Sequence, residues 1–154
     1  MKRKMAKWGW MIALLMILAF IWGNSMLKAE NSSELSGGLF ELIKTLPWIG
    51  KISVINEALL RKMAHFGEFF LLSAALYGAY RGRISKWTHL LVGLGVALID
   101  ETIQLSSSGR AAQVRDVWID FAGFCTGMLC ILVVHRVKAY IRRRRENVKS
   151  SSGD

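Results

Sequence analysis

Long apolar runs separated by short polar segments dominate the chain. The first run, residues 8–27, contains twenty residues without a formal charge. At about 1.5 Å per residue, a helix of that length spans roughly 30 Å, the thickness of the hydrocarbon core of a bilayer. Residues 63–80, 87–105 and 117–135 approach that length and each carry only a few ionisable residues. The pattern predicts an all-α, polytopic membrane protein with four transmembrane helices.

Short connections between the later runs predict how the helices are arranged. Segments 81–86 and 106–116 are polar and short, which is typical of hairpins between neighbouring antiparallel helices. We therefore expect an antiparallel bundle of four helices. The expected segments are the basic N-terminus 1–7, helices at 8–27, 63–80, 87–105 and 117–135, loops at 28–62, 81–86 and 106–116, and a basic tail at 136–154.

The first run also has a feature of signal peptides, because four basic residues precede it. Against cleavage, the run is long for the apolar region of a signal peptide, and no site of the A-x-A type follows it. We therefore expect residues 8–27 to remain as the first transmembrane helix.

The long segment 28–62 has a pattern of its own. Leucine and isoleucine recur at helical spacing near residues 38–46, and Glu41 and Lys44 lie between them. Pro47 ends this pattern, and Trp48 follows it. We expect a short amphipathic helix on the membrane surface, with Trp48 in the headgroup zone.

The charge of the chain gives its orientation. Lys and Arg number 21 against 11 Asp and Glu, for a net charge of +10, while 53% of the residues are hydrophobic. Fourteen of the basic residues fall in segments 1–7, 81–86 and 136–154, and seven in the other segments. The positive-inside rule then places both termini in the cytoplasm. For the four arginines at 142–145, this placement favours anionic lipids at the cytoplasmic face over nucleic acid as the partner.

Placing an ionisable side chain inside the bilayer costs free energy, so the membrane depth of such residues indicates where a functional site lies. The ionisable residues of the second, third and fourth predicted helices lie at a similar membrane depth, near the outer ends of these helices. Lys62, Arg110 and Arg115 lie just outside that depth. By contrast, His89 and His135 lie near the inner ends, where we expect them to extend to the interface. The candidate binding residues are Lys62, His65, Glu68, Asp100, Glu101, Gln104, Arg110, Arg115, Asp116 and Asp120.

Helical spacing also aligns some of these residues on one face. Asp116, Asp120, Gly123 and Gly127 follow one another by four, three and four residues, so the carboxylates share a face with a GxxxG step. Such a step permits close contact with another helix. Gly93 and Gly95 are candidates for the same role in the third helix. The sequence thus predicts an outward-opening polar pocket above tightly packed helices.

Three sequence blocks resemble the VanZ-like family of small bacterial membrane proteins. They are KMAHFGEF, DETIQ and GRAAQVRDVWIDFAGFCTG, which lie in order within residues 61–127. The chain departs from the family pattern at Phe69, where Tyr is common, and at Ser108, where Pro often stands. The founding member is associated with low-level resistance to the glycopeptide antibiotic teicoplanin. The resemblance implies a single VanZ-like domain over about residues 8–135 and a role in the envelope, at the bacterial cytoplasmic membrane.

Three functions fit the predicted pocket. It could bind an anionic lipid, a lipid-linked wall precursor or the antibiotic, with the basic rim holding the anionic group. Alternatively, the protein is an intramembrane enzyme with His65 as general acid or base, oriented by Glu68 or Asp120. In a metal variant, a hard cation such as magnesium or manganese binds His65 and carboxylates from the set Glu68, Asp100, Glu101 and Asp120. The third possibility is an ion-pair network that only holds the helices. We favour binding, expect no metal or cofactor, and leave enzyme activity and oligomeric state open.

Overall fold

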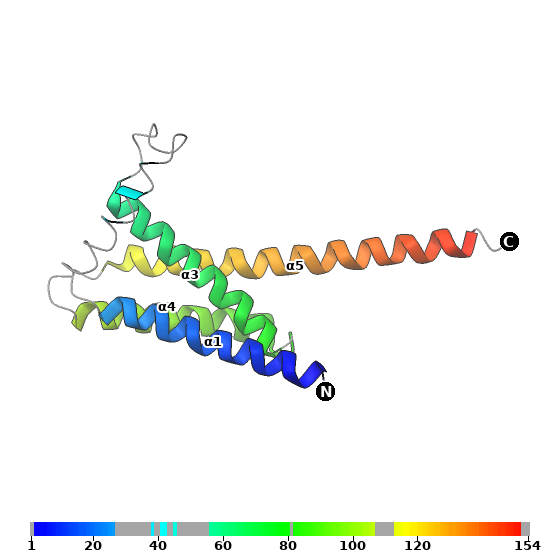
Figure 1. Cartoon of the computed structure of the whole chain (residues 1–154), viewed down its shortest axis with the longest axis horizontal. Helices are drawn as coiled ribbons and strands as arrows, with labels where there is room; N and C mark the ends of the chain where they lie inside the picture. Colours follow the sequence, from blue (N-terminus) through cyan, green and yellow to red (C-terminus); the bar gives the residue numbers. More distant parts are fainter. Residues whose placement is uncertain are drawn as a thin grey trace.

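The described part of the chain is all-helical. A computed structural model describes residues 2–26, 38, 41–42, 45, 56–80, 82–106 and 113–151. Its long helices are α1 (Lys2–Met26), α3 (Glu57–Tyr80), α4 (Lys86–Ser106) and α5 (Val114–Ser151). Figure 1 shows α1 and α4 side by side, α3 crossing close to α5, and α5 extending far beyond the other helices. The predicted all-α class is confirmed for these residues.

Three of the four long helices have the length and composition of membrane spans. They are Lys7–Met26 in α1, Lys86–Ser106 in α4 and Val114–Asn147 in α5. The remaining helix, α3, carries Arg61, Lys62 and Glu68 and is not among these three. Most of the amphipathic helix expected near 38–46 lies outside the described residues; of those described, 38 and 41–42 are helical and Thr45 lies in a turn. The chain is therefore a multi-pass membrane protein.

Polar side chains at the helix ends explain where α3 and α4 begin. The Leu59 amide donates to Asn56 Oδ1 at 2.8 Å, and the Thr88 amide donates to Ser85 Oγ at 3.0 Å. Both acceptors satisfy amides of a first helical turn, which lack partners within the helix. The turn after α3 contains Gly82 at a φ of 66°, a conformation that glycine adopts without steric cost. Helix α3 thus begins six residues before the apolar run predicted at 63–80.

Helix α5 is longer than the fourth transmembrane segment that the hydropathy pattern predicts. It contains 38 residues, which corresponds to about 57 Å at 1.5 Å per residue. The basic tail expected from residue 136 continues the same helix as far as Ser151 (Figure 1). Asp116 lies in the first turn, where a negative charge interacts favourably with the helix dipole.

Two glycines allow α3 and α5 to touch through their backbones. A Cβ on Gly127 would lie 2.6 Å from the carbonyl oxygen of Phe70, and one on Gly123 would overlap the carbonyl oxygen of Phe66. The predicted role of the GxxxG step in close packing is therefore confirmed. On α4, Gly93 packs against the Phe124 ring, whereas a Cβ on Gly95 would meet nothing within 4 Å. The same expectation is right for Gly93 and wrong for Gly95.

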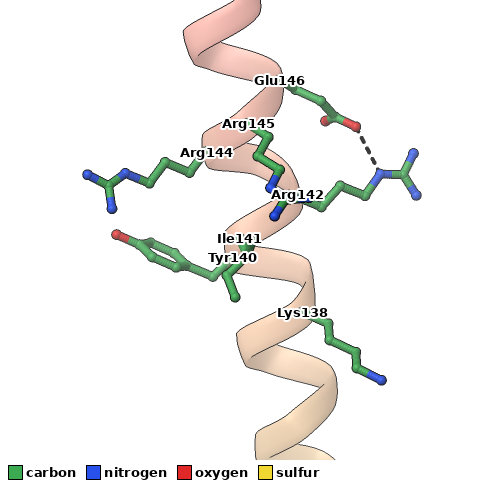
Figure 2. A pocket seen from close by; sticks show the side chains of 7 residues that line it. All are labelled: Lys138, Tyr140, Ile141, Arg142, Arg144, Arg145 and Glu146. Atoms are coloured by element: carbon green, nitrogen blue, oxygen red, sulfur yellow. Dashed lines mark hydrogen bonds and ion pairs between the residues drawn. The ribbon is translucent and has the colours of Figure 1, made fainter.

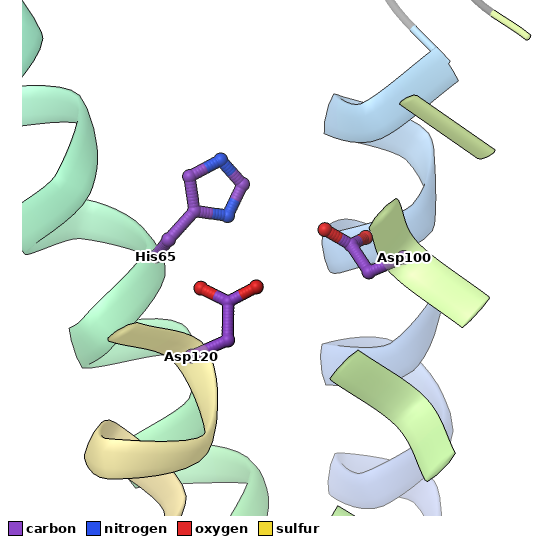
Figure 3. Close-up of side chains that lie close together, drawn as sticks. All are labelled: His65, Asp100 and Asp120. Atoms are coloured by element: carbon purple, nitrogen blue, oxygen red, sulfur yellow. The ribbon is translucent and has the colours of Figure 1, made fainter. Parts of the chain in front are cut away.

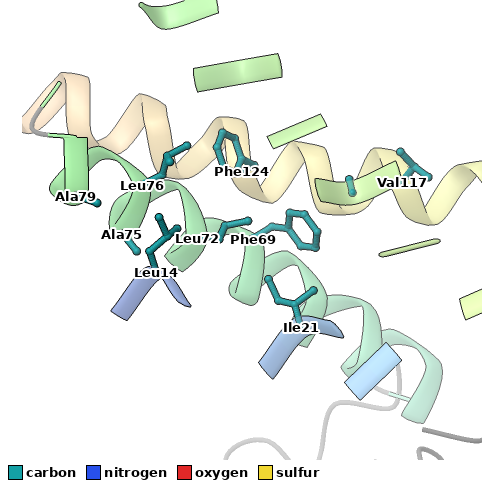
Figure 4. Close-up of a cluster of buried hydrophobic side chains, with 10 residues drawn as sticks. Leu14, Ile21, Phe69, Leu72, Ala75, Leu76, Ala79, Val117 and Phe124 are labelled. Atoms are coloured by element: carbon teal, nitrogen blue, oxygen red, sulfur yellow. The ribbon is translucent and has the colours of Figure 1, made fainter. Parts of the chain in front are cut away.

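The apolar core lies along α3, which faces α1 on one side and α5 on the other (Figure 4). Phe69, Leu72 and Phe124 are among its fully buried side chains. Many large apolar side chains lie on the outer surface instead, among them Phe20 at 60% and Leu91 at 67% exposed. Extensive exposed apolar surface of this kind marks contact with a membrane or a partner. The members of the core are Leu14, Ile21, Phe69, Leu72, Ala75, Leu76, Ala79, Ala97, Val117 and Phe124.

Candidate functional site

Polar residues from all four long helices meet at one end of the assembly. The last turns of α1 and α4 and the first turns of α3 and α5 lie at this end (Figure 1). The meeting of the three later helices at one level agrees with the sequence-based expectation. We call these residues the polar cluster: Asn24, Ser25, Lys62, His65, Glu68, Asp100, Glu101, Gln104, Asp116 and Asp120.

Asp100 joins α1 to α4 within the polar cluster. Its side chain is fully buried, and so is that of Ser25. The Ser25 hydroxyl donates to Asp100 Oδ1 at 2.6 Å, and the Gln104 amide donates to Oδ2 at 2.8 Å. Both carboxylate oxygens therefore accept a hydrogen bond, which offsets part of the cost of burying them.

Glu68 joins α1 to α3. The Asn24 amide donates to Glu68 Oε1 at 3.2 Å, while Glu68 Oε2 lies 3.5 Å from His65 Nδ1 one turn earlier on α3. The side chains of His65 and Glu68 are 17% and 13% exposed. The carboxylate thus lies beside the Nδ1 edge of the imidazole ring, at ion-pair distance and not in a hydrogen bond with it.

Asp120 is a buried carboxylate of α5 that lacks a partner among the described residues. It is 2% exposed, and within the described ranges no hydrogen bond or ion pair joins it to another residue. One ligand atom each from His65, Asp100 and Asp120 lie within 4.8 Å of one another. Figure 3 shows the imidazole ring of α3 and the carboxylates of α5 and α4 around a common space. Among the described residues, these three are the group that could hold a cation.

Lys62, Asp116 and Glu101 make contacts around this centre. Lys62 Nζ lies 3.1 Å from Asp116 Oδ1, and the two side chains are 29% and 31% exposed. Glu101 Oε1 accepts a 2.6 Å hydrogen bond from the Gln113 amide, which connects the end of α4 to the residue before α5. Arg115 is exposed, and Arg110 lies outside the described residues. The structure therefore brings together eight of the ten predicted residues.

Sequence reasoning missed the contribution of α1. The apolar run 8–27 was treated as uniform, yet Asn24 and Ser25 reach Glu68 and Asp100 from its end. A signal was present, because these two residues are the only amide and hydroxyl side chains in that run. Polar side chains inside an apolar helix usually find a partner on a neighbouring helix.

A second polar contact lies deeper between α3 and α4. The side chains of Ser73 and His89 are joined by a hydrogen bond of 3.0 Å between Oγ and Nε2, and His89 also packs against the Phe124 ring. His89 is only 3% exposed, so the prediction that it extends to the interface is wrong. The hydroxyl of Ser73 provides a polar partner inside the protein, and the ring packs there instead.

We expect Ser73→Ala to destabilise the protein by about 1 kcal/mol, because it leaves the buried His89 nitrogen without this hydrogen bond. The measurement is the midpoint of thermal unfolding in detergent. Thr126→Ala is a matched control, since that hydroxyl bonds only to a carbonyl of its own helix. A double change, Ser73→Ala with His89→Leu, should recover part of the loss. Equal effects of Ser73→Ala and the control would contradict the role of this contact.

Two of the larger hollows formed by the described residues lie away from the polar cluster. One, of about 1030 Å³, lies beside the basic tail, and Figure 2 shows that all its lining side chains come from α5. No residue from another helix is among those that line this hollow, so it is open on the side away from α5. The other, of about 530 Å³, is an apolar groove between α1, α3 and α5 that includes Trp10, Tyr77 and His135. Neither hollow contains a residue of the predicted site.

Comparison with known proteins gives one family. The family model described as VanZ/LLP1 matches residues 10–135, a range that includes the whole polar cluster. No curated protein and no solved structure matches the chain.

Proposed function

The chain belongs to the VanZ/LLP1 family, and from that membership we propose that it binds a cell-envelope component at the bacterial cytoplasmic membrane. In this proposal all four long helices cross the membrane as an antiparallel bundle, with one domain over about residues 8–135. The excess of basic residues in segments 1–7, 81–86 and 136–154 supports cytoplasmic termini. The polar cluster then faces outward, toward the cell wall.

The observation that carries the proposal is the unpaired Asp120. Buried charges in proteins are normally paired, because an isolated charge is expensive to remove from water. In a network that served only to hold the helices, each acidic side chain would be paired with a basic one. Lys62 and Asp116 form such a pair, with 3.1 Å between Nζ and Oδ1. Asp120 carries the same carboxyl group, is more deeply buried and has no such partner among the described residues. This supports an external binding partner at the polar cluster.

The chemistry of the polar cluster indicates what kind of ligand fits. Its carboxylates accept hydrogen bonds, so they suit hydroxyl, amide or ammonium groups. Lys62 and Arg115 at its edge offer charge-assisted hydrogen bonds to a phosphate. A lipid-linked wall precursor combines both kinds of group with a lipid tail that can remain in the bilayer. An anionic lipid or a glycopeptide antibiotic of the teicoplanin type shares part of this chemistry, and the link of the family to that antibiotic supports the same site.

The test is native mass spectrometry of protein extracted gently from bacterial membranes. We expect a lipid-linked wall precursor to remain bound to the wild type and to be lost from Asp120→Asn. Glu146→Gln is the control, because it removes a carboxylate from the exposed tail helix. Retention of an ordinary anionic lipid alone, or of added teicoplanin alone, would assign the site to that ligand instead. Protein with no bound envelope component, in membranes shown to contain all of them, would contradict the proposal.

One contact also supports an enzyme at the same site. His65 Nδ1 lies 3.5 Å from Glu68 Oε2, close enough for the pair to act as a general acid or base if the contact shortens when substrate binds. If the bound precursor is converted during incubation, His65→Gln should abolish the conversion and leave binding detectable. Conversion that persists in His65→Gln would exclude His65 as a required acid or base.

A further inference from the structure

We propose that His65, Asp100 and Asp120 form a binding site for a divalent cation of the manganese or magnesium type. The site does not depend on the envelope ligand proposed above, and it departs from the sequence-based expectation of no bound metal. It joins three helices, α3, α4 and α5, at the level where their polar residues meet.

The geometry of the three side chains fits one cation. Their ligand atoms lie within 4.8 Å of one another, and Figure 3 shows the two carboxylates and the ring facing a common space. Oxygen ligands bind Mg²⁺ at about 2.0–2.1 Å and Ca²⁺ at about 2.3–2.6 Å, so ligands on opposite sides of an ion are separated by roughly 4–5 Å. The observed spacing therefore leaves room for one ion without moving a helix.

Asp120 provides an independent reason to expect a ligand there. Its side chain is 2% exposed and has no hydrogen bond or ion pair with any residue of the described helices. The nearest described lysine in the polar cluster, Lys62, is already paired with Asp116 at 3.1 Å. A divalent cation would compensate Asp120 and Asp100 together, which the described basic residues do not do.

Neighbouring residues already orient Asp100, one of the three ligands. Asp100 accepts hydrogen bonds from Ser25 and Gln104 at 2.6 and 2.8 Å, and its oxygens retain lone pairs for a cation. Such second-layer contacts fix the direction of metal ligands and raise metal affinity.

The ligand types select the class of metal. Two carboxylates favour hard cations such as magnesium and manganese, while one imidazole nitrogen favours manganese over magnesium within that class. Soft metals prefer thiolates, and neither cysteine of the chain belongs to this group of three. Manganese is therefore the best probe, and it is paramagnetic.

The experiment measures Mn²⁺ binding to full-length protein in detergent by electron paramagnetic resonance, with no envelope ligand added. We expect one Mn²⁺ per chain and a magnetic coupling to one imidazole nitrogen, which His65→Gln removes. Asp120→Asn should weaken binding by more than about 100-fold, and Ser25→Ala, through Asp100, by about 10-fold. Glu146→Gln should bind as the wild type does, because its carboxylate lies on the exposed tail.

Stability provides a second measurement that keeps the test decisive. Mn²⁺ should raise the unfolding temperature of the wild type but not of Asp120→Asn, because a ligand stabilises only the state that binds it. If Asp120→Asn does not fold, the nitrogen coupling in wild type and its loss in His65→Gln decide the matter. Absence of Mn²⁺ binding, or binding that neither variant alters, would overturn the proposal. Because no envelope ligand is added, the result of the Mn²⁺ experiment does not depend on whether the proposed envelope ligand binds.

Discussion

Replacing Gly123 with alanine is expected to destabilise the protein by about 3 kcal/mol, at the upper end of the usual cost of overpacking. The added Cβ would overlap the backbone carbonyl of Phe66, and a backbone atom cannot turn away as the end of a side chain can. Helices α3 and α5 must therefore separate where they pack most closely. The measurement is the unfolding midpoint in detergent, and fluorescence transfer between labels on the two helices would report their separation.

Gly95→Ala is the matched control for this experiment. It makes the same chemical change inside a helix, but the new Cβ would meet nothing within 4 Å. Alanine is also favoured over glycine in helix interiors by roughly 0.5–1 kcal/mol, so stability should stay the same or rise slightly. If both variants lost stability equally, the contact between α3 and α5 would not be the cause.

The second large effect is expected from Asp100→Ala, with a loss of about 1–3 kcal/mol. The change removes the shared acceptor of Ser25 and Gln104 and breaks the shorter of two direct hydrogen bonds between α1 and α4, leaving the 3.4 Å bond from Gln104 to Ser25. Hydrogen bonds between membrane helices average about 0.6 kcal/mol, but buried donors that lose an acceptor cost more. The unfolding midpoint should fall, and a disulfide trap between the ends of α1 and α4 should form less efficiently.

Thr102→Ala serves as the control for Asp100→Ala. It lies two residues away on α4 and is exposed, and its hydroxyl donates to the carbonyl of Leu98 in its own helix. Changes at such surface positions usually stay within about 0.5 kcal/mol. A loss in Thr102→Ala as large as that in Asp100→Ala would show that any change near the end of α4 is damaging, and would remove the special role of the carboxylate.

The depth of the polar residues was predictable from the sequence, whereas their pairing was not. Helical rise converts a position in an apolar run into a depth, so His65, Asp100 and Asp120 could be placed at one level. Pairing depends on how each helix is rotated about its axis. The hydropathy pattern does not fix that rotation when lipid and protein neighbours are equally apolar. This is why the contact of Ser25 with Asp100 was missed.

The same limit explains the error at His89. Its place near the inner end of an apolar run predicted extension to the interface, but the helix is rotated so that the ring faces Ser73 on α3. The GxxxG step was easier to predict, because two glycines one turn apart mark a face by themselves. Small residues thus identified a packing surface where large apolar residues did not.

The hydrogen bond between Ser25 and Asp100 also constrains the order of assembly. The two residues are 75 positions apart, so α1 is made long before its partner on α4 exists. At roughly 5–20 residues per second, the ribosome takes about 4–15 s to produce the intervening chain. During that interval Ser25 must remain near water or bond elsewhere, because hydrocarbon offers it no partner. Helix α1 can therefore settle into its final position only after most of the chain has been synthesised.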